Sequence, residues 1–353
     1  MCVSVISAAG NLAGNQAAFQ NLIHFIKTRE KGIILVISPL DEIFSHVLTQ
    51  LDSLSHGARE ATDYDSRLSD IWRKTTGTSP DGKYPVLVKR LSGLLKGISL
   101  TGDCSDTLRE DILAFCRHLS ALIFSEKLRI SGVGNSIRIP DKSGARVSDR
   151  MNIDGYPEYD NAAAVCPKPW ETWVVADIYR RSAKEEIPGR NASAVHTAAL
   201  LAVKFQSPEL ILWSDEIRFH TAPPDLCPRS REITRLTFQE AGAISGFMND
   251  TIHPCTLELL EARQISVHVY NPEQSVWKPV TIICSVWDNR EETFRAVACT
   301  GDISLLEMTG PGVGSDPGIL TGITGMLSGL AISTKSLSVS RNSIRIEIGR
   351  AHV

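Results

Sequence analysis

The stretch that decides the fold is Gly32-Ile33-Ile34-Leu35-Val36-Ile37-Ser38, in which five apolar residues follow one another without a break. A strand that is apolar at every position has both faces buried, which is typical of a parallel sheet covered by helices on two sides. A helical apolar pattern at residues 18–26 precedes this strand, and Asp41 stands where the cap of a following helix belongs. The opening of the chain therefore predicts alternating helices and strands.

The same alternation continues along the chain after a polar stretch at residues 53–83. Strands are predicted at residues 173–178, 209–213 and 265–270, and helices at residues 108–128, 194–205 and 238–247. This order predicts an α/β fold with a mainly parallel sheet. Ligands in such folds bind beyond the carboxyl ends of the strands, so the loops after Ser38 and Trp213 are the first places to look.

The pattern changes after Tyr270, where Pro272 and Pro279 interrupt the chain. A strand is predicted at residues 280–287, and a compact strand, helix, strand, strand unit follows. Its elements lie at residues 303–308, 319–330, 332–339 and 344–347. We expect a first domain over residues 1–275 and a second over residues 276–347.

Composition narrows the class of protein. The chain has 353 residues, enough for two domains, and its formal net charge of -3 leaves no basic surplus for nucleic acid. No stretch approaches the roughly 20 apolar residues that span a bilayer. The eight cysteines are dispersed without Cys-x-x-Cys spacing or a nearby His, so we expect reduced thiols in a cytoplasmic protein and no metal site.

The last six residues, 348–353, read Ile-Gly-Arg-Ala-His-Val. A DNA sequence similar to a common sequencing-library adapter can encode them, so we expect these residues to be an artefact and the gene to continue beyond them. The alternative is a natural tail of this sequence.

The segment from Leu212 to Pro224 reads L-W-S-D-E-I-R-F-H-T-A-P-P, and residues 236–241 and 253–256 read L-T-F-Q-E-A and H-P-C-T. These three segments resemble the aspartate kinase patterns (I/L)-W-T-D-V-D-G-(F/Y)-x-T-A-D-P, L-S-Y-x-E-A and H-P-x-T, in one register. The resemblance implies an amino-acid-kinase-type three-layer α/β sandwich, followed by a ferredoxin-like α+β domain of the ACT type.

The resemblance also implies a reaction and its partners. Aspartate kinases use ATP with Mg²⁺ to phosphorylate the side-chain carboxylate of L-aspartate, giving 4-phospho-L-aspartate. Their ACT domains bind an end-product amino acid, such as lysine or threonine, and usually mediate association, so a homo-oligomer is expected.

Individual site residues follow from the matched motifs. On the substrate side they are Ser38 and Glu126, the latter because F-S-E-K-L at residues 124–128 is similar to S-x-G-E-(R/K)-L. On the nucleotide side they are Trp213, Ser214, Asp215 and Phe219, and on the effector side Gly312, Val313 and Gly314. The alternatives are an ordinary strand-end serine at Ser38, a solvated acid at Glu126, a core tryptophan at Trp213 and a dinucleotide loop at residues 310–314.

The phosphate-handling motifs depart from the family. Val5 stands where the family has a lysine, and Ser7 and Ala8 replace two glycines. The phosphate loop, at residues 189–198, lacks its Gly-Gly pair and its aspartate, and Asp250 replaces a second lysine. Phosphoryl transfer depends on such cations and backbone groups, so we expect impaired or lost kinase activity and name no catalytic residue.

Three hypotheses remain open. The chain is a weak or inactive aspartate kinase kept for regulation, or an active one in which Lys127, Arg190 or Lys184 substitutes for the missing cations. The third hypothesis is that it is the N-terminal part of a fused aspartate kinase and homoserine dehydrogenase in which the dehydrogenase alone is active. His196 is read as a structural residue more readily than as a base.

Overall fold

The structure is a computed structural model, and it describes residues 3–55, 64–138, 167–177, 190–246, 252–274, 277–286, 295–299, 303–330, 332 and 334–349. The chain divides into two compact units, Met1–Val297 and Ala298–Val353.

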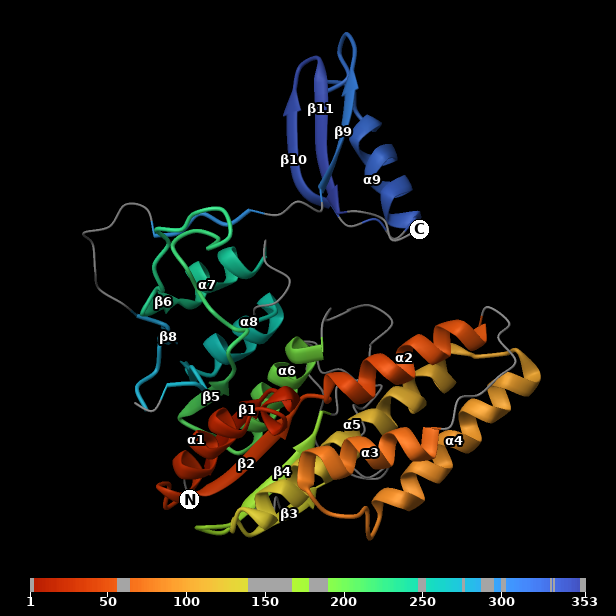
Figure 1. The fold of residues 1–353 in the computed structure, drawn as a ribbon. Helices are drawn as coiled ribbons and strands as arrows, with labels where there is room; N and C mark the ends of the chain where they lie inside the picture. Colours follow the sequence, from red (N-terminus) through yellow and green to blue (C-terminus); the bar gives the residue numbers. More distant parts are fainter. Residues whose placement is uncertain are drawn as a thin grey trace. The chain divides into compact units, whose positions relative to one another are not determined.

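The first unit is built on an eight-stranded sheet with the order β3-β4-β2-β1-β5-β7-β8-β6 (Figure 1). The strands are β1 (Val3–Ala8), β2 (Gly32–Ile37), β3 (Asn135–Arg138), β4 (Thr172–Ala176), β5 (Glu209–Trp213), β6 (Arg235–Thr237), β7 (Ser266–Tyr270) and β8 (Thr281–Cys284). Neighbouring strands run parallel except β7 and β8, which are antiparallel. The sheet is therefore mainly parallel, as predicted.

Helices cover both faces of this sheet. They are η1 (Gly10–Ala13), α1 (Gln16–Lys27), α2 (Asp41–Ser55), α3 (Tyr64–Thr76), α4 (Tyr84–Thr101), α5 (Asp106–Ile130), α6 (Arg190–Lys204), α7 (Phe238–Ser245) and α8 (Pro254–Ala262). Helices α1 to α5 share one apolar core with alternate residues of the strands, such as Ile6 and Ala8 of β1. Helix α6 packs on β1, β2 and β5, and α8 packs on β7.

Local sequence explains where several elements begin. All six residues of β1 and all six of β2 are buried, which explains why β2 is apolar from Ile33 to Ile37 and why β1 adds only the small polar residues Ser4 and Ser7. Asn15 caps α1 by accepting a hydrogen bond from the amide of Ala18. Thr237 and Glu240 form a reciprocal capping box at the start of α7.

The second unit has a three-stranded antiparallel sheet with the order β10-β11-β9. Its elements are β9 (Ile303–Thr309), α9 (Ile319–Gly329), β10 (Thr334–Ser340) and β11 (Ser343–Gly349). Ile323 and Leu327 of α9 pack on Ile344 and Ile346 of β11. The predicted strand, helix, strand, strand order is therefore present.

The structure adds three observations to the expectations from the sequence. The first unit ends at Val297 instead of near residue 275, because β8 pairs with β7 and β6 inside the large sheet. The polar stretch at residues 53–83, for which the sequence predicted no element, contains α3, which buries Leu68 and Trp72. Ile348 and Gly349 pair with β9, while residues 350–353 lie outside the described part of the chain.

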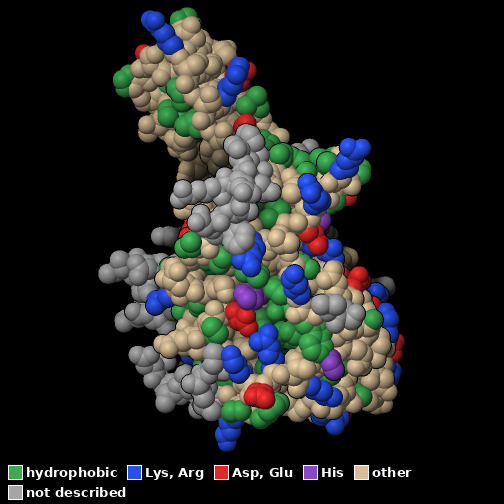
Figure 2. Space-filling view, turned by 90° about the vertical axis from the view of Figure 1, so that its left-hand side faces the viewer, with side chains coloured by type: hydrophobic (Ala, Val, Ile, Leu, Met, Phe, Trp, Pro, Cys, Tyr) green, Lys and Arg blue, Asp and Glu red, His purple; other side chains and the backbone are tan. Residues whose placement is uncertain are grey.

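Surface features of the described residues add little to the choice of function class. On the face drawn in Figure 2, basic and acidic side chains are interspersed and do not form a large patch of one sign. None of the described helices combines the length and apolarity needed to cross a membrane. Within the same residues, His, Cys, Asp and Glu side chains form no group of three or more placed to hold a metal ion.

Candidate functional site

The candidate site lies where the parallel strands end. The end of β1 and the residues that follow β1, β2 and β5 meet the start of α6 there and line a cavity of about 10 Å³. The lining residues are Ser7, Ala8, Ala9, Ser38, Ala194, Val195, Ser214 and Ile217. A cavity of that volume has room for about one water molecule between the described side chains.

A buried carboxylate lies at the same edge of the sheet. Asp177 directly follows β4, and its side chain is 1% exposed. Its two oxygens accept hydrogen bonds from two hydroxyls of α6, Ser193 Oγ at 2.6 Å and Thr197 Oγ1 at 2.7 Å. The carboxylate thus ties the end of β4 to the first turns of α6.

A buried cation completes this cluster. Arg117 projects from α5 with a side chain that is 13% exposed, and its Nε lies 3.4 Å from Asp177 Oδ2. This distance makes an ion pair, but Nε has no acceptor in hydrogen-bond geometry. The pair neutralises the charge of both groups and links the helical layers on the two faces of the sheet.

Ser38 lies in the site, but its hydroxyl is hydrogen-bonded to the backbone. Ser38 Oγ accepts a hydrogen bond from the amide of Gly10 at 2.9 Å, inside the structure. A Cβ on Gly10 would lie 2.4 Å from the carbonyl oxygen of Ser38, so this close approach requires glycine. The hydroxyl therefore positions the turn after β1 against the end of β2.

The four residues expected on the nucleotide side lie at the end of β5 and in the turn after it, and they have different environments. Trp213 and Phe219 are fully buried, and the Trp213 ring stacks on Tyr270 with 5.6 Å between centroids. Ser214 Oγ accepts hydrogen bonds from the amides of Glu216 and Ile217, which holds the turn. Among these four residues, Asp215 alone is exposed.

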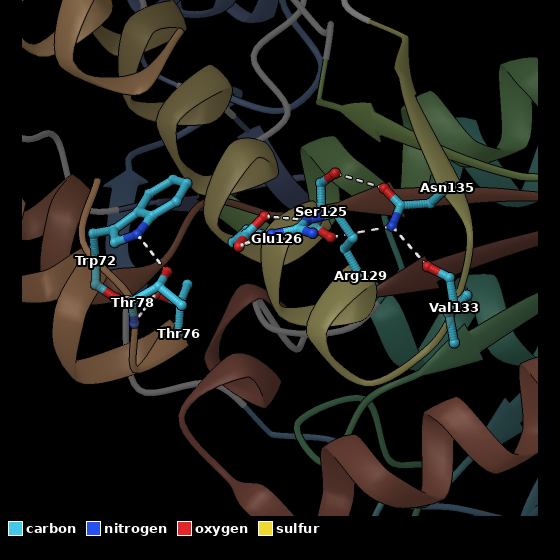
Figure 3. Close-up of polar contacts among 8 residues, drawn as sticks. All are labelled: Trp72, Thr76, Thr78, Ser125, Glu126, Arg129, Val133 and Asn135. Carbon is cyan, nitrogen blue, oxygen red and sulfur yellow. Dashed lines mark hydrogen bonds and ion pairs between the residues drawn. The ribbon is translucent and has the colours of Figure 1, made fainter. Parts of the chain in front are cut away.

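Glu126 lies away from this cluster, on the last turns of α5. Both of its carboxylate oxygens accept hydrogen bonds from Arg129, at 2.7 and 2.8 Å, as Figure 3 shows. These bonds lower the pKa of Glu126 below its ordinary value. The neighbouring Ser125 is hydrogen-bonded to Asn135, the first residue of β3, and none of the contacts among the described residues joins Glu126 to Ser38.

The expected effector turn lies in the second unit, between β9 and α9. Gly312 has a φ of +78°, a conformation that favours glycine. A Cβ on Gly314 would lie 1.7 Å from the carbonyl oxygen of Ser340, so the turn packs directly on the β10–β11 hairpin. Val313 packs against the small core of this unit.

The cations proposed as substitutes for the missing lysine are placed as follows. Lys127 donates a hydrogen bond to the carbonyl of Ala13 and lies over the ring of Phe19, and burial lowers its pKa. Lys184 and residues 247–250 lie outside the described residues, and so does the side chain of Arg190. Val5 itself is fully buried in the middle of β1.

His196 is a core residue of α6. Its Nδ1 lies 2.9 Å from Thr256 Oγ1 at the start of α8. Burial is the main cause that lowers its pKa to about 4, and the neighbouring His253 lowers it further in the same direction. A histidine that stays neutral at pH 7 and bonds a neighbouring helix fits the structural interpretation.

The described residues do not fit a bound Mg²⁺-nucleotide in this conformation. The cavity is about 10 Å³, Trp213 and Phe219 belong to the core, and the nearby cation Arg117 is paired with Asp177. Phosphates need cations or free backbone amides, and a Mg²⁺ ion needs several oxygen ligands. The described side chains are therefore not arranged to hold the phosphates of ATP or its metal ion in this conformation.

The sequence analysis missed Arg117 and Asp177. Asp177 could have been identified from its position in the sequence, because an acidic residue directly after a buried strand of a parallel sheet lies at the edge where ligands bind. Arg117 carried a weaker signal, since it is a charged residue between buried Cys116 and Leu119 on a helix.

Known proteins with similar sequences are kinases. A model of the amino acid kinase family matches residues 3–271. The chloroplastic bifunctional aspartokinase/homoserine dehydrogenase 1 of Zea mays is 22% identical over 330 residues, which cover 90% of this chain and 33% of that protein. Lysine-sensitive aspartokinase 3 of Escherichia coli K12 is 24% identical over 282 residues, 75% of this chain and 61% of that protein. The chain thus spans about a third of the first relative.

The fold has a solved counterpart. Aspartokinase III of E. coli in complex with aspartate and ADP superposes with a TM-score of 0.73 at 19% identity, covering 99% of this chain and 79% of the other. The same enzyme in complex with lysine and aspartate gives a TM-score of 0.68, with 99% and 80% covered.

Proposed function

Because this chain belongs to the amino acid kinase family, we propose that its first unit is an aspartate-kinase-type domain with strongly impaired transfer of phosphate from ATP to L-aspartate. The second unit is, in this proposal, an ACT-type regulatory module. Together they form a small-molecule-binding protein of aspartate-family amino acid biosynthesis.

The observation that carries the proposal is the charge balance of the described side chains in and around β1 and β4. The resemblance places a lysine of the family at Val5 of β1, and among the described residues the buried cation near the ends of the strands, Arg117, is paired with Asp177. Catalysis of phosphoryl transfer is mainly electrostatic, and loss of a single donor typically lowers the rate about 10²- to 10³-fold. Several losses in one site therefore predict very slow turnover.

The test is an assay of acyl phosphate formation from ATP and L-aspartate, trapped as the hydroxamate. A matched control is E. coli aspartokinase III cut to the region that superposes on this chain, so that both proteins lack the same C-terminal part. We expect this chain to be at least about 100-fold slower than the control. Equal turnover would refute the impairment, and the folded state of both samples is checked by circular dichroism.

A regulatory role for the second unit is supported by its surface. Leu305, Leu337 and Val339 on β9 and β10 are 60%, 44% and 46% exposed, and such apolar side chains on one small sheet are typical of an association surface. We infer that this unit binds an end-product amino acid and mediates homo-oligomerisation. Lysine or threonine binding by calorimetry, and mass by light scattering, test the two parts separately.

A second candidate is favoured by the relatives. Two of them, from Zea mays and Buchnera aphidicola, are bifunctional aspartokinase/homoserine dehydrogenases, of which the chain covers 33% and 30%. We infer as the alternative that the chain is the N-terminal part of such a fusion, in which the dehydrogenase alone is active. Sequencing the source DNA past Glu347 decides it: a strand, glycine-rich turn and helix of the dinucleotide-binding type supports the fusion, and an early stop codon excludes it.

A further inference from the structure

A second polar cluster lies at the opposite edge of the large sheet, where β5 and β7 begin. Glu209 is the first residue of β5, and it pairs in register with Ser266, the first residue of β7. Side chains two residues apart on a strand share a face, so Ser266 and His268 point to the same side. Glu209, two residues before Ile211 of the α1 to α5 core, lies on that side as well.

The three side chains form one continuous chain of hydrogen-bonding distances. Ser266 Oγ lies 3.1 Å from His268 Nε2, and His268 Nδ1 lies 3.1 Å from Glu209 Oε2. A single neutral tautomer satisfies both contacts: Nδ1–H donates to the carboxylate, and Nε2 accepts from the serine hydroxyl. The nucleophile-to-base and base-to-carboxylate distances both fall in the range of about 2.6–3.2 Å that activates a hydroxyl.

Arg29 holds the carboxylate in place. Its Nη1 lies 3.1 Å from the other oxygen of Glu209, and its guanidinium lies over the ring of Phe25 at 4.6 Å. Both oxygens of Glu209 therefore have a partner, which fixes the carboxylate plane toward His268. This support matters because a base works best when a third group orients its ring.

We propose that Ser266, His268 and Glu209 act as nucleophile, base and orienting carboxylate, and that they give the protein a second activity, hydrolysis of small activated esters. Ser266 Oγ attacks the ester carbonyl carbon while its proton passes to His268 Nε2. The alkoxide leaves with that proton, and the serine carries the acyl group. Water then attacks the acyl-serine through the same base, which releases the acid and restores the hydroxyl.

The groups around His268 keep its imidazole in the neutral form that can accept a proton. Burial lowers the pKa of His268, the Arg29 charge lowers it further, and the Glu209 carboxylate acts against both by raising it. Tyr270, the remaining titratable group on the same face of β7, has a raised pKa and stays neutral near pH 7. His268 is therefore neutral and able to accept a proton at neutral pH.

The exposure of the cluster indicates the substrate class. The side chains of His268, Glu209 and Arg29 are 22%, 20% and 25% exposed, so the relay opens to solvent at a shallow surface. Such a surface favours small acyl donors with good leaving groups over large substrates that need a deep pocket. Fluorophosphonates belong to the same class of electrophile, and they replace the acyl step by loss of fluoride.

The test is labelling of the full chain by a fluorophosphonate probe, located by mass spectrometry of the peptides. We expect the label on Ser266, its loss in Ser266→Ala, and a rate at least about 100-fold lower in His268→Asn, because a general base contributes 10²- to 10⁴-fold. Ser328→Ala, a change at an exposed serine of α9, serves as the control with wild-type labelling. No label on the wild-type chain, a label elsewhere, or an unchanged rate in His268→Asn would each overturn the proposal.

Glu209 needs a separate readout because it acts through His268. Glu209→Gln removes the charge that raises the pKa of His268, so the midpoint of the pH–rate profile for labelling moves to lower pH. A lowered rate with an unmoved midpoint would show that the charge of Glu209 does not act on the base that activates Ser266, and that result would overturn its assigned role. These outcomes do not depend on the kinase proposal, because the candidate kinase site lies at the other ends of the strands.

Discussion

Replacing Asp177 by alanine is expected to destabilise the first unit by about 3–5 kcal/mol, the range observed when one partner of a buried ion pair is removed. The side chain of Asp177 is 1% exposed and that of Arg117 is 13% exposed, so neither charge is relieved by water. The variant leaves the guanidinium without this counter-charge and deprives the hydroxyls of Ser193 and Thr197 of their acceptor.

Urea unfolding followed by tryptophan fluorescence measures this effect on the first unit alone, because all six tryptophans precede residue 298. A domain of this kind is stable by about 5–15 kcal/mol, so Asp177→Ala can approach complete unfolding. Asp177→Asn is the milder companion, because it keeps an oxygen acceptor and removes the charge.

A double-mutant cycle separates the interaction free energy of the ion pair from the other effects of each substitution. Arg117→Met removes the cation and leaves Asp177 with its two hydroxyl donors, so its effect is smaller than that of Asp177→Ala. Combining Arg117→Met with Asp177→Ala is expected to destabilise less than the sum of the two single changes. A loss below about 1 kcal/mol for Asp177→Ala, or strict additivity in the cycle, would refute the role assigned to this pair.

Three further predictions concern other parts of the chain. The pKa of His196 is about 4 in the folded state and near 6.5 in the unfolded state, so the protein loses stability as the pH falls from about 6.5 toward 4. The loss is up to about 1.4 kcal/mol per pH unit. Urea unfolding midpoints measured across that range check this slope, and in His196→Gln the midpoint should depend less on pH. Gly314→Ala places a methyl group against the carbonyl of Ser340, so it lowers the melting temperature of the second unit. Gly325→Ala adds a methyl group in open space on α9 and raises the stability of this unit by up to about 1 kcal/mol. The melting temperatures of the two variants, measured by calorimetry, should therefore shift in opposite directions. Ser38→Ala removes the acceptor of a buried amide and is expected to destabilise by about 1–3 kcal/mol in urea titrations, and an unchanged midpoint would contradict the positioning role.

The central strands of the sheet could be predicted from the sequence because burial on both faces forces an apolar residue at every position. β2, which the structure places at residues 32–37, is of this kind, and so are residues 210–213 of β5, whose first residue is the half-buried Glu209. Helix α3 escaped prediction for the opposite reason. It buries Leu68, Ile71 and Trp72 among mainly polar residues, so its apolar stripe is narrow.

The candidate site was harder to predict because its contacts join residues that are distant in the sequence. Arg117 and Asp177 are sixty positions apart, and which turn of α5 reaches the sheet edge depends on packing. Glu126 lies nine residues after Arg117 on the same helix, which moves a side chain about 14 Å along the axis. A motif match on a long helix therefore shows reliably which helix lies near the site, and less reliably which of its side chains reaches the site.

The central claim is that the kinase scaffold persists while its phosphate-handling groups are lost. The most direct measurement compares the affinities of ATP, with Mg²⁺, and of adenosine for this chain and for the matched region of E. coli aspartokinase III by titration calorimetry. The account predicts that the control gains at least tenfold in affinity from the phosphates, about 1.4 kcal/mol, while for this chain the two ligands bind within about threefold of each other. A phosphate-dependent gain in this chain equal to that of the control would contradict it.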